Sequence, residues 1–303
     1  MFEQLSFAFG ITGPILLLLA IGWGVRCLGW VGEEFVSQAN TVVFNIAMPV
    51  MLFFAISGGN FKEAVNVPLT LVGAVGTLLL VGLLLIVGKL LPDAQRGVFV
   101  QGSYRGNLAI LGVALCVAAY GDGVLPMVAL YIGVVTTFYN VLAVWVLNSS
   151  GALSKVVKNP ILIGIFFGAL ASLVQLPVPV FIESTGQYLT QMTLPLALLC
   201  IGATLNFGSL KKNRHSVSLA TMFKLVISPL LLVSIGLLVP LEPQALGVLF
   251  FMSASPTATA SYIMAKQMTA HGPLAAEIVA VTTTLGVLTY TIGLALLRSM
   301  QVI

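Results

Sequence analysis

Ten apolar stretches, each about as long as a lipid bilayer is thick, constrain this chain more than any other feature. A membrane-spanning helix needs about 20 mostly apolar residues. Stretches of this kind lie near residues 8–29, 35–58, 67–91, 96–120, 124–147, 160–177, 184–207, 216–240, 244–267 and 275–298. Charged residues make up 7% of the 303 residues, whereas a soluble domain has about a quarter. The sequence therefore predicts an all-α membrane protein with ten transmembrane helices.

The same composition excludes several other classes of protein. The apolar runs are continuous rather than alternating, which excludes an outer-membrane β-barrel. The net charge of +4 is dispersed between apolar runs, so no nucleic-acid partner is expected. The three cysteines form no CxxC pair and have no nearby histidine, so neither a disulfide framework nor a metal site is predicted. We interpret the first apolar stretch as a retained helix rather than a signal peptide, because it lacks a basic leader and a cleavage signature.

The positive charges predict an orientation. With the N-terminus outside, the inner loops and helix ends hold Arg26, Lys89, Arg96, Lys155, Lys158, Lys211, Lys212, Arg214 and Lys266. The outer ones hold only Lys62 and Arg298. This bias follows the positive-inside rule. We therefore expect a multi-pass protein of the inner (cytoplasmic) membrane, with both termini outside.

The second half of the chain repeats residues of the first half at nearly constant spacing. At an offset of 146 the matching pairs are Pro49 and Pro195, Leu52 and Leu198, Asn60 and Asn206, and Phe61 and Phe207. At an offset of 150 they are Gly97 and Gly247, Val98 and Val248, and Ser103 and Ser253. Each half has five predicted helices, an odd number, so the halves cross the membrane in opposite directions. We predict inverted repeats over residues 1–147 and 160–303, joined by an inner linker at 148–159, as is typical of secondary transporters.

The offset of 150 aligns two polar triplets midway along helices four and nine, Arg105-Gly106-Asn107 and Ser255-Pro256-Thr257. A broken helix inside a membrane is tolerated only where it is buried in protein or lines a water-filled cavity. Ser255 and Pro256 predict an N-cap followed by proline at the first helical position, while Gly106 and Asn107 favour a break in helix four. Two half-helix N-termini would then face each other near the midplane, where their partial positive charge suits an anion.

Arg105 is the strongest single candidate for a substrate-binding residue. It lies nine residues after Arg96, about 13 Å further along a helix, and an arginine at such depth is by default a functional residue. Helices four and nine offer no acidic partner beside the triplets. We hypothesise that the missing counter-charge is the substrate, a carboxylate held by the guanidinium group. The alternative is that Arg105 bonds backbone carbonyls of a neighbouring helix and only holds the break open.

Other polar residues in the spans are weaker candidates. Asn45 and Gln191 share the offset of 146 and either line a path between the halves or bond between helices. Asn140 in helix five is a further binding candidate, with contact between crossing helices as the alternative. Lys224 is expected to snorkel to the interface or to bond internally. Glu277 is a weak candidate for a proton carrier.

Five segments together resemble a known family. They are Phe44-Asn45-Ile46-Ala47-Met48-Pro49, Arg105-Gly106-Asn107-Leu108-Ala109-Ile110-Leu111-Gly112, Lys158-Asn159-Pro160, Leu194-Pro195-Leu196-Ala197-Leu198 continuing through Gly202-Ala203, and Ser255-Pro256-Thr257-Ala258. In this order and at these helix positions they resemble the bacterial auxin efflux carrier family, relatives of the plant PIN-FORMED exporters. The resemblance extends over essentially all ten predicted spans.

The resemblance implies a fold similar to bile acid:sodium symporters, with helices four and nine crossing as broken helices. It implies a scaffold of helices one, two, six and seven, and a transport domain of helices three to five and eight to ten that moves as an elevator. A homodimer through the scaffold fits the resemblance. The implied substrates are small organic anions, either dicarboxylates such as malonate and malate or auxin-like carboxylates. The chain departs from the family in lacking the usual proline at the break in helix four.

These observations favour a secondary carrier of organic anions, and no cofactor is expected. The coupling ion, a proton or sodium, is left open, and a sodium-coupled symporter of the bile-acid type is the nearest alternative. The lack of acids beside Arg105 and Ser255 disfavours a sodium site, although backbone carbonyls and Ser, Thr and Asn oxygens remain possible ligands. A transporter-like membrane sensor is a second alternative. No motif of an intramembrane enzyme is present, so we expect no enzyme.

Overall fold

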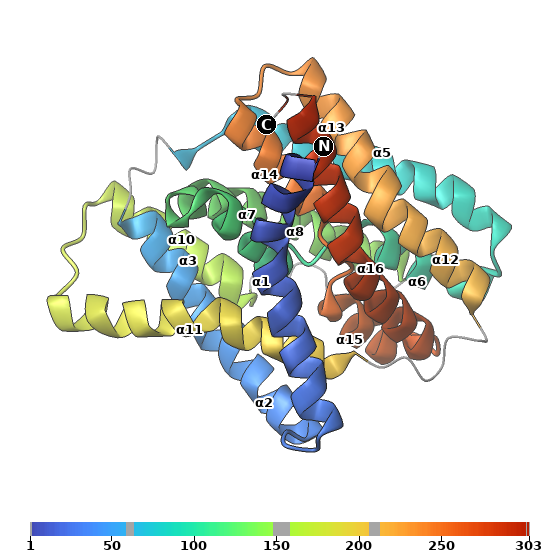
Figure 1. The fold of residues 1–303 in the computed structure, drawn as a ribbon, viewed down its shortest axis with the longest axis horizontal. Coiled ribbons are helices and arrows are strands. Elements are labelled where there is room, and N and C mark those ends of the chain that lie inside the picture. Colours follow the sequence, from blue (N-terminus) through green and yellow to red (C-terminus); the bar gives the residue numbers. More distant parts are fainter. Residues whose placement is uncertain (1, 59–63, 148–157, 206–212, 301, 303) are drawn as a thin grey trace.

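The computed structural model describes residues 2–58, 64–147, 158–205, 213–300 and 302, and its regular elements are helices (Figure 1). In chain order they are α1 (Phe2–Cys27), α2 (Glu33–Val42), η1 (Val43–Ala47), α3 (Met48–Ser57), α5 (Val67–Val87), η2 (Gly88–Leu90), α6 (Asp93–Tyr104), η3 (Leu108–Gly112), α7 (Val113–Tyr120), η4 (Asp122–Val124), α8 (Leu125–Val146), α10 (Pro160–Leu173), α11 (Val180–Thr204), α12 (Arg214–Met222), η5 (Phe223–Ile227), α13 (Ser228–Leu238), α14 (Pro243–Ala254), α15 (Thr259–Met268) and α16 (Gly272–Ser299). The all-α prediction is confirmed.

Helices occupy every predicted apolar stretch, with ends that differ by several residues. Six helical segments are long and apolar enough to cross a membrane: Glu3–Cys27, Glu33–Ser57, Val67–Leu90, Asp122–Val146, Arg214–Leu238 and Gly272–Ser299. The predicted stretch 160–177 stops being helical at Leu173 because Gln175 has a positive φ of 50° and two prolines follow closely. By length and composition these segments fit a multi-pass membrane protein, and the count of ten spans stays a prediction.

Two long helices contain a widened turn just before a proline. The π-helical turn η1 ends two residues before Pro49, and the π-helical turn η5 ends two residues before Pro229. A proline ring clashes with the carbonyl four residues earlier and provides no N–H for it. Widening the preceding turn relieves that clash, so each helix continues through its proline. The second widened turn matters below because it carries Lys224.

Close helix pairs on one side of the molecule depend on glycine. Helix α1 packs along α11, and α10 packs along α3. Gly22 of α1 lies against the backbone of Leu199 in α11, and Gly168 of α10 lies against the backbone of Phe53 in α3. A Cβ atom at either glycine would overlap a backbone atom of the partner helix. The first and last helices also meet, because the Arg298 guanidinium carbon lies 3.5 Å from the centre of the Phe7 ring.

Some sequence predictions fall on residues outside the described ranges. They are the repeated residues Asn60, Phe61, Asn206 and Phe207, the orientation charges Lys62, Lys155, Lys211 and Lys212, and linker residues 148–157. The last two residues of the predicted linker, Lys158 and Asn159, are described and lie directly before α10.

Candidate functional site

The two polar triplets interrupt their helices and lie side by side. Three residues, 105–107, separate α6 from η3, and four, 255–258, separate α14 from α15. We call these two segments together the crossover. They run antiparallel, with a bridge between Gly106 and Thr257. Two backbone hydrogen bonds complete it, from the Asn107 N–H to the Pro256 carbonyl at 2.7 Å and from the Ala258 N–H to the Arg105 carbonyl at 2.9 Å. Each break thus provides hydrogen-bond partners for backbone groups of the other. Inside a bilayer such groups need partners within the protein, because no water is available to them.

Glycine is needed at position 106 because of space rather than backbone conformation. Gly106 is not among the residues with positive φ. A Cβ atom built on it would lie 2.6 Å from the Ser255 hydroxyl oxygen and 3.2 Å from the Lys224 ammonium nitrogen. The first distance is shorter than real Cβ atoms show, so the Ser255 hydroxyl would have to shift to admit any larger residue.

The predicted N-cap at Ser255 is wrong. The Ser255 hydroxyl donates back to the Met252 carbonyl at 2.7 Å, and the next helix, α15, begins only at Thr259. Pro256 is therefore not the first residue of a helix. The physical reason is the crossover itself, because the backbone after Ser255 is extended and paired with the opposite triplet before the helix resumes.

Thr257 is held from two sides. Its hydroxyl donates to the Gly102 carbonyl at 2.6 Å, and its N–H donates to the Thr282 hydroxyl oxygen at 3.1 Å. Thr282 in turn donates to the Ile278 carbonyl of its own helix α16 at 2.7 Å. The second half of the crossover is thereby fixed to α6 and to α16, and its residues 255–257 face protein rather than a cavity.

Arg105 is buried, with 6% of its surface exposed. One guanidinium nitrogen donates to the Tyr139 carbonyl at 3.2 Å, and the other terminal nitrogen donates to the Asn140 side-chain oxygen at 2.8 Å. The Tyr104 hydroxyl donates to the same Tyr139 carbonyl at 3.2 Å. These bonds to α8 match the expected bonding to a neighbouring helix. The guanidinium group also lines a cavity, which leaves the predicted anion role open.

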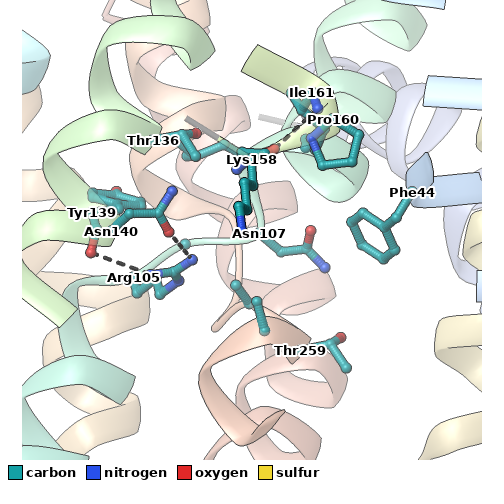
Figure 2. Close-up of a pocket in the computed structure, with 16 residues that line it drawn as sticks. Phe44, Arg105, Asn107, Thr136, Tyr139, Asn140, Lys158, Pro160, Ile161 and Thr259 are labelled. Carbon is teal, nitrogen blue, oxygen red and sulfur yellow. Dashed lines mark hydrogen bonds between the residues drawn. The ribbon is translucent and has the colours of Figure 1, made fainter. Parts of the chain in front are cut away.

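That cavity lies beside the crossover and has a volume of about 350 Å³. It is lined by Phe44, Arg105, Gly106, Asn107, Leu108, Ala109, Thr136, Tyr139, Asn140, Lys158, Asn159, Pro160, Ile161, Ala258, Thr259 and Ala260. Figure 2 shows Arg105 and Asn140 on one side and Lys158 extending toward them from the segment before α10. The lining therefore joins residues from both halves of the sequence.

The electrostatics of the cavity favour negative charge. Residues 107–109 and 258–260 in its lining are the N-cap and the first two residues of two helices, the η3–α7 helix and α15. Their N–H groups give each helix end a partial positive charge. Arg105 and Lys158 add two cations, and none of the described lining residues is acidic. The Asn107 side chain, 6% exposed, takes part in none of the hydrogen bonds of the described chain, so it is available to a ligand.

The structure groups some of the predicted site residues and separates others. Arg105, Gly106, Asn107 and Asn140 line the cavity, whereas Ser255, Pro256 and Thr257 form the opposite, protein-facing half of the crossover. Asn45 and Gln191 have exposed side chains and do not belong to the lining. Within the described ranges no cluster of three His, Cys, Asp or Glu residues suited to a metal ion occurs.

Several residues of the site carried no clear signal in the sequence. Lys158 and Asn159 were visible only as part of the Lys158-Asn159-Pro160 segment, whose proline begins α10 and whose asparagine side chain accepts the Ile161 N–H at 3.0 Å. This N-cap fixes where Lys158 stands at the cavity. Phe44 likewise appeared only as the first residue of the segment Phe44-Asn45-Ile46-Ala47-Met48-Pro49.

Lys224, in η5, packs against the crossover. Its side chain is fully buried, and its ammonium group donates to the Ser253 carbonyl at 2.7 Å, near the end of α14. The expected internal bond is therefore confirmed, and snorkelling to the interface is excluded. Glu277 is also buried, and its carboxylate accepts a hydrogen bond from the Asn213 side chain at 3.4 Å. It forms no ion pair with any cation of the described residues.

The fold and the site together define a class of protein. Several helices long enough to span a bilayer, with two interrupted helices that meet beside a cavity, are the arrangement of membrane transport proteins. A family model described as "Membrane transport protein" matches residues 11–156 and 144–294. The chain belongs to this family, which confirms the resemblance to auxin efflux carriers.

Individual relatives are distant but match over nearly their whole length. A putative malonate transporter of Rhizobium meliloti is 23% identical over 96% of this chain and 96% of its own. An uncharacterized transporter of Methanocaldococcus jannaschii is 25% identical over 90% of this chain and 94% of its own. An uncharacterized transporter of Escherichia coli K12 is 23% identical over 88% and 90%. This protein is therefore a multi-pass membrane transporter.

Proposed function

We propose that this protein is a secondary active transporter of small organic anions, which bind in the cavity beside the crossover. One observation carries the proposal: a buried arginine, Arg105, and the N-terminal ends of two helices line one cavity that has no acidic residue in its described lining. Helix N-termini and guanidinium groups are the usual partners of carboxylates in proteins. An anion would then replace water or the Asn140 side chain as a partner of Arg105.

Among organic anions the cavity favours dicarboxylates. Lys158 provides a second cation, placed on a different part of the lining from Arg105. Two separated cations match the two charges of a malonate- or malate-like molecule better than the single charge of an auxin-like one. The name of the Rhizobium meliloti relative, a putative malonate transporter, points the same way. Monocarboxylates remain the second class.

The architecture proposed for this activity is two inverted repeats of five spans each. Helix packing supports it, because the contacts Gly22–Leu199 and Gly168–Phe53 are related by the offset of 146 found in the sequence. Adding 146 to Gly22 gives Gly168, and adding 146 to Phe53 gives Leu199. The contact of helix one with helix seven is therefore equivalent to the contact of helix six with helix two. Equivalent contacts of this kind are expected where two halves have the same fold.

The movement proposed is an elevator. The lining contributed by Phe44 and residues 158–161 belongs to helices two and six, the proposed scaffold, and the rest belongs to the proposed transport domain. An anion in the cavity would therefore lie between the two parts, where a relative shift changes its access. Location in an inner membrane with both termini outside, and a homodimer through the scaffold, complete the proposal.

Counterflow in proteoliposomes tests the function. Vesicles loaded with unlabelled malonate should accumulate radiolabelled malonate against its gradient, because exchange requires alternating access. The same assay with indole-3-acetate measures the preference between the two substrate classes. A sensor would bind malonate without counterflow, so binding without accumulation would contradict the carrier and favour the sensor.

A further inference from the structure

Lys224 is a buried lysine that has no carboxylate partner among the described residues. Lys224 has no exposed surface, and a cation at such depth is costly unless other groups satisfy it. The ion pairs of the described residues, Arg26–Glu33 and Arg96–Asp93, lie elsewhere. The position of Lys224 therefore requires another source of negative potential.

Oxygen atoms at the end of α14 provide that potential. The ammonium group donates to the Ser253 carbonyl at 2.7 Å, and the Ser228 hydroxyl donates to the same carbonyl at 3.3 Å. The Ser255 hydroxyl oxygen and the ammonium nitrogen also flank the same point, the position of a Cβ on Gly106. Lys224 thus lies directly behind the crossover, on the protein-facing half rather than in the cavity lining.

The end of a helix attracts a cation for two reasons. Its last carbonyls have no partner within the helix, and its dipole gives it a partial negative charge. Helix α14 ends at Ala254, one residue after the carbonyl that Lys224 contacts. In transporters with broken helices, carbonyls at the C-terminal ends of half-helices coordinate the coupling Na⁺. An ammonium group and a sodium ion have the same charge and need the same oxygen acceptors.

We propose that the Lys224 ammonium group is a resident cation that occupies the place of a coupling sodium ion at the C-terminal end of α14. The Lys224 side chain then provides the positive charge beside the crossover, so no sodium ion from solution has to bind there. Anion transport by this protein is consequently independent of a sodium gradient. The transport consequence rests on the proposed function, whereas the occupancy of the site by Lys224 does not.

Thermal unfolding of the full-length protein in detergent tests the occupancy directly. The comparison uses wild type, Lys224→Ala and the control Lys89→Ala, whose lysine is exposed at η2, each in chloride salts of sodium, methylammonium or N-methylglucamine at equal ionic strength. Wild type and the control should give the same Tm in all three salts. Lys224→Ala should unfold earlier in N-methylglucamine and recover at least about 3 °C in sodium or methylammonium, because a cation bound only by the folded state raises the Tm.

Two outcomes of this experiment would overturn the proposal. A wild-type Tm that rises with sodium would place a sodium site elsewhere. A Lys224→Ala variant whose Tm no cation changes would make Lys224 a packing group only. A second experiment measures transport by the wild-type protein, which does not depend on whether a variant folds. Its rates of malonate counterflow should be equal with and without a sodium gradient. Sodium-stimulated malonate counterflow would contradict the resident cation, whereas absent counterflow with cation-dependent stability would contradict only the proposed function.

Discussion

Two cations are buried at the crossover, and they have opposite surroundings. Arg105 lines the cavity and shares its guanidinium group between a carbonyl and the Asn140 amide of α8. Lys224 is behind the crossover and donates to the Ser253 carbonyl at the end of α14. One cation is within reach of a molecule in the cavity, and the other is enclosed by protein. We therefore propose that the buried charge of Arg105 serves binding and that the buried charge of Lys224 serves structure.

The difference follows from the direction of the two helix breaks. The break in helix four leads into a helix whose first residues line the cavity, so positive charge there accumulates beside Arg105. The end of α14 presents carbonyl oxygens, so the positive charge of Lys224 is neutralised locally.

Replacing Arg105 should weaken malonate binding strongly, whereas replacing Lys224 should not. Arg105→Gln removes the charge that a carboxylate would use, so the Kd for malonate should rise by about 10- to 100-fold. Lys224→Met is the matched variant, and its Kd should stay within about threefold while its Tm falls. Isothermal titration of both purified proteins measures the Kd. A similar rise of the Kd for malonate in both variants would contradict the different roles assigned to Arg105 and Lys224.

Adding a methyl group at position 106 should strain the crossover. Gly106→Ala places a Cβ against the Ser255 hydroxyl, and overpacking of this kind costs about 1–3 kcal/mol. Ser255→Ala removes that hydroxyl, so the double variant should recover part of the lost stability. Thermal unfolding of the two single variants and the double variant forms a mutant cycle. If the stability changes of the two single variants simply add up in the double variant, the residue at position 106 and the Ser255 hydroxyl do not contact each other as described.

Lys158 should matter for dicarboxylates more than for monocarboxylates. Lys158→Gln should raise the Kd for malonate by about three- to tenfold, because one charge-assisted contact is lost, and change the Kd for the monocarboxylate indole-3-acetate by less than about twofold. Lys89→Gln removes an equivalent charge outside the cavity and should change neither. Equal effects of Lys158→Gln on both ligands would argue for general attraction instead of a second binding pole.

The smallest effects are expected at two residues that the repeat singled out. Asn45 and Gln191 are exposed and do not line the cavity. Asn45→Ala and Gln191→Ala should therefore leave the Kd for malonate within about twofold, since surface substitutions change free energies by about 0.5 kcal/mol or less. A tenfold loss at either position would extend the binding site beyond the described cavity.

Much of the helix map could be predicted, because hydropathy depends on sequence alone. The apolar stretches, the two interruptions and the depth of Arg105 follow from residue type and spacing. The pairing of the interruptions could not be predicted in detail. Ser255-Pro256 satisfies the local rules for a helix start, yet the extended backbone pairs with the opposite triplet first and the helix resumes at Thr259. A contact between residues 150 positions apart overrides the local preference.

The roles of the two lysines also depend on long-range contacts. Lys224 lies in an apolar stretch, where the sequence allows either snorkelling or an internal bond, and only the position of α14 decides for the bond. Lys158 belongs to a loop by every local criterion, and its place at the cavity depends on how α10 packs along α3. Residue spacing contains no information about these packings.

Protection of a single cysteine tests the central claim most directly, namely that the transported anion occupies the cavity beside Arg105. Cys116 and Cys200 are buried, so a Cys27→Ser background removes the exposed native thiol. Thr259→Cys then places a thiol in the cavity lining, and Asn45→Cys places a control thiol outside it. Malonate at ten times its Kd should slow the reaction of the cavity thiol with a methanethiosulfonate reagent by about tenfold and leave the control unchanged. Equal reaction rates of the cavity thiol with and without bound malonate would contradict the account.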